Sequence, residues 1–409
     1  MRLLIWSQYF WPENFIINPL AQALQGLDAE VSVLTGKPNY PDGKVFDGYR
    51  ASGLGYERFG QIDVFRVPVI PRGKRSRFGL ALNYLSFILS AFFFAPVLLR
   101  KKRVDVIFVY APSPLLQALP ALAFGFFRRV PVVLWVQDLW PESLAATKLV
   151  TNRWLLKAVR ECVRTIYKHV DLVLVQSEAF IGPISCLGVN REKIVYFPNP
   201  AEEIRSEGEI GVIDDFLIKR IQKNFSVVFA GNIGSVQSCE TIVRAAEVLK
   251  GIPDIQFFLI GDGSSYDSVK AEIINRGLSN VHMSGRIPST KMAAVFSMAK
   301  VLVVTLRRDP VLALTVPSKL QAYLSAGRPI VACVDGEAAR IVKEAEAGLA
   351  CPAEDFESLA NAIAHLYSLP EHVRREYGEN GVSYFFKHYE MTSQATRLLN
   401  LLRPFAAKT

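Results

Sequence analysis

A lysine at the start of a predicted helix is the first feature of this sequence that suggests chemistry. The segment VPSKLQAYLSAGRPIVA, residues 316–332, begins with a proline, a serine and Lys319 and continues with the spacing of an apolar helix. It has no acidic residue between Lys319 and Gly327. The first N–H groups of a helix are unpaired and lie at the positive end of its dipole, so a cation there is useful mainly when an anion binds. The sequence therefore predicts a phosphate site at this helix start.

A glycine turn offers a second place for a phosphate. The segment FAGNIGSVQSCETIVRAA, residues 229–246, is typical of a strand, a turn and a helix. Gly231 and Gly234 let the backbone approach a ligand, and the N–H groups that follow can face a diphosphate. The spacing is not G-x-G-x-x-G, so an ordinary tight turn fits it about equally well.

Two arginines strengthen the phosphate interpretation. Arg307 and Arg308 lie in TLRRDP, at the end of the predicted strand that precedes residues 316–332. Each one alone is more typical of a solvated surface charge. Three cations and two helix starts at strand ends of one domain nevertheless suit a nucleoside diphosphate.

A carboxylate follows an apolar strand in the first half of the chain. In VVLWVQDLWPESL, residues 132–144, Asp138 comes where a ligand-facing loop should begin, and Glu142 follows four residues later. One interpretation is a helix cap, with Asp138 or Ser143 capping and Pro141 in the first turn. The other is a catalytic or acceptor-binding role. Trp140 is either a stacking platform for a sugar or part of the core wall.

Several motifs that mark metal, phosphate-loop or nucleophile sites are missing from the sequence. The sequence has no D-x-D loop, no G-x-x-x-x-G-K-[ST], no H-E-x-x-H and no G-x-S-x-G. None of the five histidines lies near the loop after residue 137. The five cysteines are scattered without paired spacing, which fits a reduced compartment and excludes a C-x-x-C site. We expect no metal site and no cofactor.

The elements that position these residues repeat one pattern twice. At 409 residues the chain is long enough for two domains. Both halves alternate continuous apolar strands with helices, which predicts two doubly wound parallel-sheet (Rossmann-like) α/β domains with ligands at the carboxyl ends of the strands. We expect an N-terminal domain over residues 1–200, a linker over 201–224, a C-terminal domain over 225–388, and a final segment, 389–409, whose helix packs back on the first domain.

Charge is concentrated in the first half. Residues 1–200 hold 24 Lys and Arg against 14 Asp and Glu, whereas the remainder holds 23 against 24. Two basic clusters bracket the apolar run FGLALNYLSFILSAFFFAPVLL, residues 78–99; they are Arg72, Lys74, Arg75 and Arg77, and Arg100, Lys101, Lys102 and Arg103. The run is either a transmembrane segment, a buried core helix or, as we favour, a helix that also docks on an anionic membrane surface. No recognition pattern for nucleic acid accompanies it. No secretory signal is apparent at the N-terminus.

The motifs together resemble a known family. PNYPDGKVFDGY, VQDLWPES, AGNIGSVQ, VPSKLQAYLSAGRPI and DGEAARIVKEAEAGL are similar, in this order, to family 4 glycosyltransferases of the GT-B fold, in which two such domains face a cleft. The branch they resemble is typified by WbuB, an N-acetyl-L-fucosamine transferase of O-antigen assembly. The resemblance implies a nucleotide-sugar donor in the C-terminal domain, an acceptor in the N-terminal domain, and metal-independent transfer that retains the anomeric configuration.

The resemblance also implies site residues. Many members have two glutamates eight residues apart near the donor, but Leu314 and Ala322 stand at these places. We therefore expect Gln321 to reach the ribose and Glu337 to reach the sugar. The expected donor-binding set is Gly231, Asn232, Gly234, Ser235, Arg286, Arg307, Arg308, Ser318, Lys319, Gln321 and Glu337. The expected catalytic residues are Asp138, Glu142 and Lys319, and the expected acceptor-side residues are Glu13, Asn14, Tyr40 and Trp140.

The function expected from this set is retaining transfer of an N-acetylated amino or deoxyamino sugar from a UDP-sugar. The expected acceptor is a saccharide linked to polyprenyl diphosphate, used in O-antigen or capsule assembly at the cytoplasmic face of the bacterial inner membrane, with peripheral attachment. Two alternatives stay open: a sugar-nucleotide epimerase of the same architecture, and a non-catalytic nucleotide-sugar-binding scaffold at the membrane.

Overall fold

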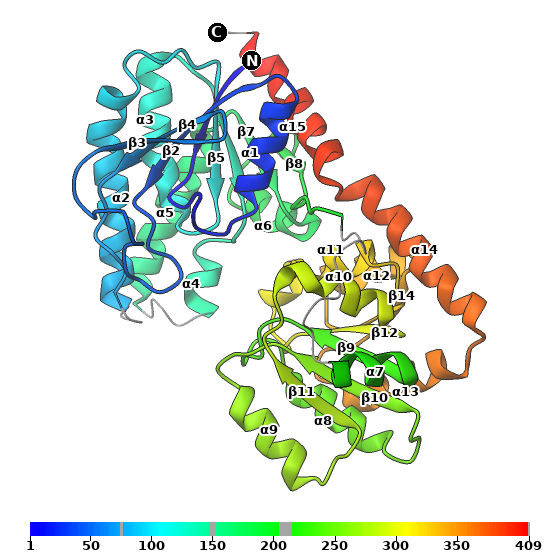
Figure 1. The fold of residues 1–409 in the computed structure, drawn as a ribbon. Helices are drawn as coiled ribbons and strands as arrows, with labels where there is room; N and C mark the ends of the chain where they lie inside the picture. Colours follow the sequence, from blue (N-terminus) through cyan, green and yellow to red (C-terminus); the bar gives the residue numbers. More distant parts are fainter. Residues whose placement is uncertain (74–76, 147–151, 204–214, 408–409) are drawn as a thin grey trace. The chain divides into compact units, whose positions relative to one another are not determined.

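The chain forms two compact units, each built on its own sheet (Figure 1). The computed structural model describes residues 1–73, 77–146, 152–203 and 215–407. One unit is Met1–Pro200 together with Met391–Thr409, and the other is Ala201–Glu390. The predicted cluster residues Lys74 and Arg75 lie outside the described residues.

The first unit contains an eight-stranded sheet in the order β3-β4-β2-β1-β5-β6-β7-β8. Neighbouring strands are parallel except β3, which runs antiparallel to β4. The inner strands are apolar runs buried on both faces, as their sequences predicted. The strands are β1 (Arg2–Trp6), β2 (Glu30–Gly36), β3 (Gly55–Phe59), β4 (Ile62–Val67), β5 (Val106–Ala111), β6 (Val132–Val136), β7 (Leu172–Val175) and β8 (Ile194–Tyr196).

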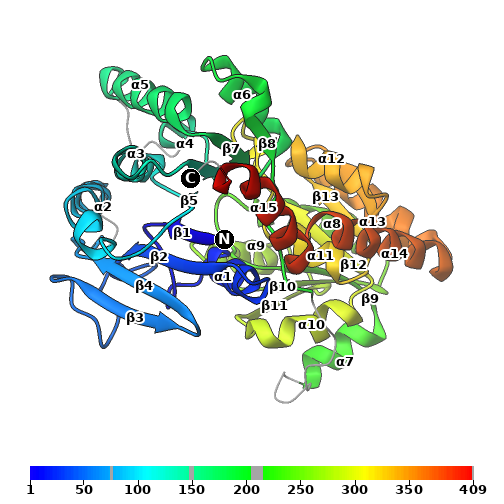
Figure 2. The same cartoon turned by 90° about the horizontal axis from the view of Figure 1, so that it is seen from above.

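Helices cover both faces of this sheet (Figure 2). On one face, α1 (Ile17–Gly26) and α15 (Met391–Ala406) pack together, and Leu398 and Leu402 enter the core beside β1 and β5. On the other face, α2 (Arg77–Leu98) packs on α3 (Ala118–Arg128), and Phe124 lies 6.1 Å from Trp6 between ring centres. The shorter elements are the 3-10 turn Leu115–Gln117, α4 (Glu142–Ala146), α5 (Arg153–His169) and α6 (Ile181–Cys186).

The second unit contains a six-stranded parallel sheet in the order β11-β10-β9-β12-β13-β14. Two apolar layers cover its two faces. The strands are β9 (Phe225–Ala230), β10 (Ile255–Ile260), β11 (Val281–Gly285), β12 (Val301–Thr305), β13 (Ile330–Cys333) and β14 (Gly348–Cys351). The helices are α7 (Asp215–Lys223), α8 (Cys239–Val248), α9 (Tyr266–Asn275), α10 (Ser289–Met298), α11 (Lys319–Ser325), α12 (Glu337–Glu344), α13 (Phe356–Ser368) and α14 (Glu371–His388).

The prediction of a linker over residues 201–224 is wrong for its second half. Residues 215–223 form α7, and Leu217, Ile218 and Ile221 are buried in the core of the second unit. The segment is polar overall, but its few apolar residues share one face of the helix, which packs on the sheet.

Strand order reverses once in each sheet. The reversal lies between β1 and β5 in the first unit and between β9 and β12 in the second. At such a point the connections leave in opposite directions, which opens a crevice at the carboxyl ends of the strands where ligands bind in open α/β sheets. The fold therefore directs attention to the loops after these strands.

Helix α2 buries only a narrow stripe. Phe87, Ala91 and Ala95 are fully buried, whereas Phe93 is 64% exposed and Val97 is 55% exposed. Of the described helices, only the stretch Phe78–Leu98 is long and apolar enough to cross a membrane, and an 18-residue window within it is 22% buried. A purely structural role in the core explains the buried stripe but not the outward aromatic face.

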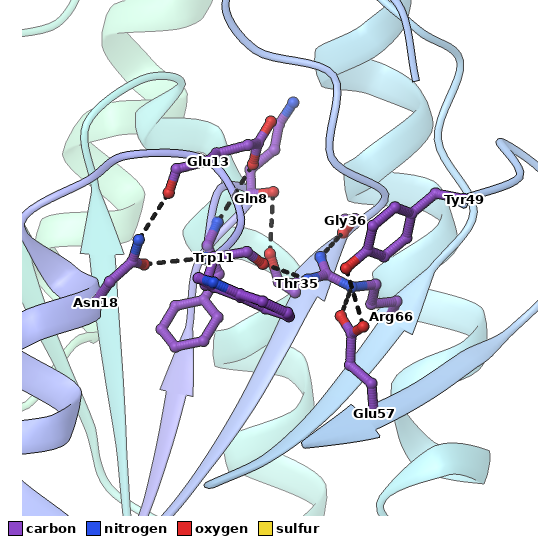
Figure 3. Close-up of polar contacts among 10 residues, drawn as sticks. Gln8, Trp11, Glu13, Asn18, Thr35, Gly36, Tyr49, Glu57 and Arg66 are labelled. Carbon is purple, nitrogen blue, oxygen red and sulfur yellow. Dashed lines mark hydrogen bonds and ion pairs between the residues drawn. The ribbon is translucent and has the colours of Figure 1, made fainter. Parts of the chain in front are cut away.

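A buried arginine ties the carboxyl end of β2 to the loop after β1 (Figure 3). Arg66 on β4 is 1% exposed and donates to the carbonyl oxygens of Gly36, at 2.7 Å, and Trp11. It also pairs with Glu57, which accepts a hydrogen bond of 2.9 Å from the hydroxyl of Tyr49. One guanidinium thus holds three separate segments together.

We predict that Arg66→Met lowers the free energy of unfolding by about 3–5 kcal/mol, because it leaves one buried carbonyl, one partly buried carbonyl and a carboxylate without their partner. The matched control is Arg58→Met on β3, whose exposed guanidinium pairs with Asp63 at 3.3 Å. That change should cost less than about 1 kcal/mol. Urea unfolding of both variants measures the difference, and equal midpoints would contradict the assigned role of Arg66.

Candidate active site

The glycine turn after β9 lies against the turn after β10. The N–H of Gly231 donates to the carbonyl of Ile260 at 2.9 Å, and the N–H of Ile233 donates to the carbonyl of Asp262 at 2.9 Å. A Cβ placed on Gly261 would lie 1.8 Å from the carbonyl oxygen of Gly231, so Gly261, with φ near +142°, must be glycine. The two turns form one backbone surface at the reversal point of the sheet.

The rest of the turn leads into α8. Asn232 donates to the side-chain oxygen of Gln237 at 3.0 Å, and a Cβ on Gly234 would approach the Asn232 amide to 2.6 Å. Ser235 is exposed at the tip. The backbone N–H of Arg307, after β12, donates to the carbonyl of Val236 at 2.8 Å. The predicted residues of this turn and Arg307 are therefore neighbours.

Lys319 brings a buried cation to this surface. Its Nζ lies 3.7 Å from the centre of the Phe229 ring and close to Gly231, where a Cβ would be 3.3 Å away. Nζ is buried and has no hydrogen-bond partner among the described residues. Burial lowers the pKa of Lys319 to about 8, because the charged form has lost its hydration. A bound anion would restore that lost stabilisation.

Tyr323 anchors the helix that carries this lysine. Its hydroxyl accepts a hydrogen bond of 2.8 Å from the N–H of Ala230, the last residue of β9. Tyr323 is fully buried, and its ring packs on Phe296 with centres 5.2 Å apart. The start of α11 is therefore held in register with the glycine turn.

The remaining donor-side predictions divide into two groups. Arg286, which is 79% exposed, pairs with Asp262 beside the glycine turn at 3.4 Å. Arg308 instead turns away, pairing with Asp335 at 3.7 Å and donating to the carbonyl of Ala353 at 2.8 Å. Only Arg286 and Arg307 therefore lie next to the turn.

The two side chains expected to replace the missing glutamates both have local partners. The amide nitrogen of Gln321 donates to the carbonyls of Pro317 at 3.3 Å and Ser318 at 2.7 Å, so it closes the start of its own helix. Ser318 is exposed there. Glu337, at the start of α12, forms a two-point ion pair with Arg340 at 2.8 and 3.0 Å.

In the first unit, Asp138 lies in the bend directly after β6. Burial raises the pKa of Asp138 to about 6. Burial also raises the pKa of Tyr84 on α2, whose hydroxyl faces Ser113 after β5 and Tyr9 after β1, and the negative charge of Asp138 raises it further. Trp140 is buried, and its ring lies 6.4 Å from that of Tyr84. The carboxyl ends of β1, β5 and β6 therefore bring a desolvated carboxylate together with hydroxyl groups.

An aromatic cluster adjoins this carboxylate. Tyr9 stacks on Phe15, with ring centres 5.1 Å apart, and lies 5.7 Å from Tyr40. The guanidinium of Arg72 lies 5.2 Å from the centre of the Tyr40 ring. Sequence reasoning named Tyr40 as an acceptor-side residue, but it assigned Arg72 to a basic cluster beside the apolar run and did not assign Tyr9 or Tyr84 to the site. The only sequence signal for Tyr9 is its position shortly after an apolar strand.

Glu13 braces the loops of this site (Figure 3). The carboxylate accepts hydrogen bonds from the N–H groups of Asn39 and Tyr40, both at 2.8 Å, and from Phe10 at 3.3 Å. Burial raises the pKa of Glu13 to about 7. Asn14 is exposed, whereas Asn18 makes the corresponding loop contacts.

Glu142 faces away from these groups. It starts α4 and pairs with Arg160 on α5 at 3.2 Å. Of the residues expected to be catalytic, Glu142 therefore bonds to α5, and its contact does not involve the groups around Asp138. Across the described residues there is no group of three or more His, Cys, Asp or Glu side chains able to hold a metal ion.

Family models match both units. The model for glycosyl transferase 4-like domains matches residues 15–200, and the model for glycosyl transferases group 1 matches residues 215–383. Probable glycosyltransferase WbjE of Pseudomonas aeruginosa is 30% identical over 317 residues, which are 73% of this chain and 75% of WbjE. The putative colanic acid biosynthesis glycosyl transferase WcaI of Escherichia coli K12 is 24% identical over 93% of this chain and 96% of its own.

Solved structures share the architecture. Anabaena HepE in complex with UDP aligns over 99% of this chain and 100% of its own, with a TM-score of 0.69 and 14% identity. Sucrose-phosphate synthase from Thermosynechococcus elongatus aligns over 100% of both chains, with a TM-score of 0.74 and 17% identity. The likeness confirms the predicted pair of parallel-sheet α/β domains. This chain belongs to the family 4 glycosyltransferases of the GT-B fold.

Proposed function

We propose that this glycosyltransferase moves a sugar from a UDP-sugar to a lipid-linked saccharide during assembly of a bacterial surface polysaccharide, with retention of configuration and without a metal ion. Two comparisons support this: the name of WcaI concerns colanic acid biosynthesis, and the HepE structure holds UDP. Within the family we place the chain in the branch of N-acetyl-L-fucosamine transferases, so the sugar is an N-acetylated amino or deoxyamino sugar.

One observation carries the proposal: the buried ammonium of Lys319 has no hydrogen-bond partner among the described residues. A lysine held over Phe229 beside a glycine turn is costly to keep charged unless an anion completes the site. The diphosphate of a nucleotide sugar supplies such an anion, and the N–H groups of Gly234 and Ser235 and the side chain of Arg307 supply its other partners.

The proposed reaction is a displacement on one face of the sugar. The bond between the sugar and the diphosphate breaks, UDP leaves with the electron pair, and the acceptor oxygen forms its bond on the same face of the sugar. The leaving phosphate takes the proton of the acceptor hydroxyl. Lys319 and Arg307 stabilise the negative charge that develops on the diphosphate. Asp138 either orients the acceptor hydroxyl or stabilises positive character on the sugar ring.

Attachment to the cytoplasmic face of the inner membrane completes the proposal. A lipid-linked acceptor lies at a membrane surface, and α2 presents an outward apolar face with exposed Phe93 and Val97. Arg100, Lys101 and Arg103 are exposed just beyond its end, whereas Lys102 pairs with Asp63 at 2.5 Å. Apolar side chains flanked by cations favour peripheral binding to anionic lipid.

Lys319→Met should lower turnover by about 10²–10³-fold, because it removes one charge that stabilises the leaving group. The same change should not lower the thermal stability of the nucleotide-free protein, because it removes a buried, unpaired charge. UDP should stabilise the wild-type protein against heat and stabilise the variant far less. Lys270→Met, at an exposed lysine on α9, is the control and should behave like wild type.

Product analysis completes this test. Mass spectrometry with UDP-sugars and lipid-linked saccharides in the presence of EDTA should detect a lengthened saccharide. An epimerised nucleotide sugar, or a donor bound but unchanged, would refute the transferase proposal. Wild-type turnover in Lys319→Met would remove this lysine from the mechanism.

Activity should depend on pH through Asp138. Because burial raises the pKa of this carboxyl to about 6, it is mostly ionised at pH 7 and becomes protonated as the pH falls through 6. The value of kcat/KM, which reports ionisations of the free enzyme, should therefore fall along an acid limb near pH 6. Asp138→Asn should lower activity and abolish that limb, whereas Glu142→Gln should keep it. A limb that persists in Asp138→Asn would assign it to another group.

Binding to anionic vesicles should depend on the cations beyond α2. Each exposed Lys or Arg near such a surface contributes about 1 kcal/mol, so replacing Arg100, Lys101 and Arg103 by serine should weaken binding about 100-fold at low salt. Added salt should weaken wild-type binding in the same direction. Replacing Lys219, Lys223 and Lys250 of the second unit is the control. Retention in the membrane through salt and carbonate washes would instead indicate a spanning helix.

A further inference from the structure

The first unit has an apolar groove that the reaction described above does not use. It lies between α2 and α5 and has a volume of about 210 Å³. The side chains that line it are aliphatic or aromatic. The lining residues are Leu80, Ala81, Tyr84, Leu85, Ile88, Pro114, Leu116, Trp140, Leu144, Leu155 and Val159.

The groove ends beside Asp138. Tyr84 and Trp140 line the groove, and the charge of Asp138 acts directly on Tyr84. The hydroxyl of Tyr84 also faces Tyr9 and feels the positive charge of Arg72. One end of the groove is therefore bordered by a carboxylate, hydroxyl groups and a cation, and the rest is apolar.

A sugar or a nucleotide does not fit this groove. Saccharides need hydrogen-bond partners along their length, and a groove of this size is smaller than the pockets that enclose compact ligands. Its outer rim includes Leu85 and Leu155, both 51% exposed, next to Trp154, which is 80% exposed. Such a patch stays in contact with water unless an apolar group covers it.

The pattern of charge indicates which apolar group this is. The ligand must be apolar over the groove and anionic or hydroxylated near Arg72 and Tyr84, so it has a head and a tail. The groove is also continuous with the outward face of α2, where Leu85 belongs to both. A peptide helix or a second copy of the chain would bury the rim but gives no reason for the cation and hydroxyl groups at one end.

We propose that the groove holds the isoprene units of the acceptor lipid nearest its diphosphate, with the diphosphate near Arg72. This inference rests on the proposed lipid-linked acceptor. The wall of the groove then fixes the lipid at one point, which positions the saccharide hydroxyl against Asp138. The enzyme selects its acceptor by the lipid as well as by the sugar, so acceptors without a prenyl chain bind weakly.

The test uses farnesyl diphosphate, a soluble prenyl diphosphate, as the probe. Ala81 lines the groove from an exposed position on α2, so Ala81→Trp fills the groove without entering the core. Leu89→Trp adds the same side chain two turns further along α2, outside the groove, and is the matched control. Because each excluded isoprene unit removes five carbons from apolar contact, Ala81→Trp should weaken binding measured by calorimetry at least about tenfold. Leu89→Trp should bind like wild type.

Two further measurements separate this inference from the proposed function. Inorganic diphosphate should compete poorly with farnesyl diphosphate for binding. The wild-type protein should bind farnesyl diphosphate more tightly than farnesol, and Arg72→Gln should remove most of this difference in affinity. UDP should still stabilise Ala81→Trp against heat, because the donor site lies in the other unit. Equal affinity of wild type and Ala81→Trp, or a change in oligomeric state without a change in prenyl binding, would overturn the groove assignment. If the wild-type protein did not bind UDP, that result would instead count against the proposed function.

Discussion

An ammonium group removed from water without a counter-ion is among the least favourable arrangements in a protein interior, and the second unit is organised around one. Nζ of Lys319 stays over Phe229 because Tyr323 fixes the start of α11 to the end of β9. The turns after β9 and β10 approach so closely that only glycine fits at Gly261. The surrounding contacts thus hold a positive charge beside backbone N–H groups before any anion is bound. This preorganisation reduces the free-energy cost of arranging the site when an anion binds.

The first unit buries a charge of the opposite sign, the carboxylate of Asp138, and also holds it with contacts between loops. Asp138 is desolvated at the end of β6, next to the strands between which the order reverses, and the described groups around it are hydroxyl and aromatic. Glu13 and Arg66 hold the loops after β1 and β2 in place, because each side chain bonds to two or more backbone groups. The sign of the charge that each unit buries therefore sets the electrostatic character of its site.

The sequence predicted the fold well because parallel strands buried on both faces are continuous apolar runs that few other structures resemble. The position of Lys319 at a helix start was also predictable, since a helix start without acidic residues is a local signal. Gln321 and Glu337 bond to neighbours three or four residues away, and Glu142 bonds to another helix. Residue type and position alone did not show these partners. Tyr9, Arg72 and Tyr84 come from three separate segments, which only the strand order brings together. Helix α7 was missed because its apolar face is short within a charged segment.

The position of α15 has a consequence for how the protein is made. This helix covers the face of the first sheet beside α1, but it follows the whole second unit along the chain. During synthesis, the contiguous part of the first unit ends at Pro200, roughly 190 residues before its cover begins at Met391, which is a delay on the order of 10–40 seconds at bacterial elongation rates. The second unit is contiguous and can complete its core within that time. The first unit must meanwhile keep a partly open core from aggregating, so a ribosome that stalls within the second unit leaves behind a nascent chain that chaperones and proteases recognise.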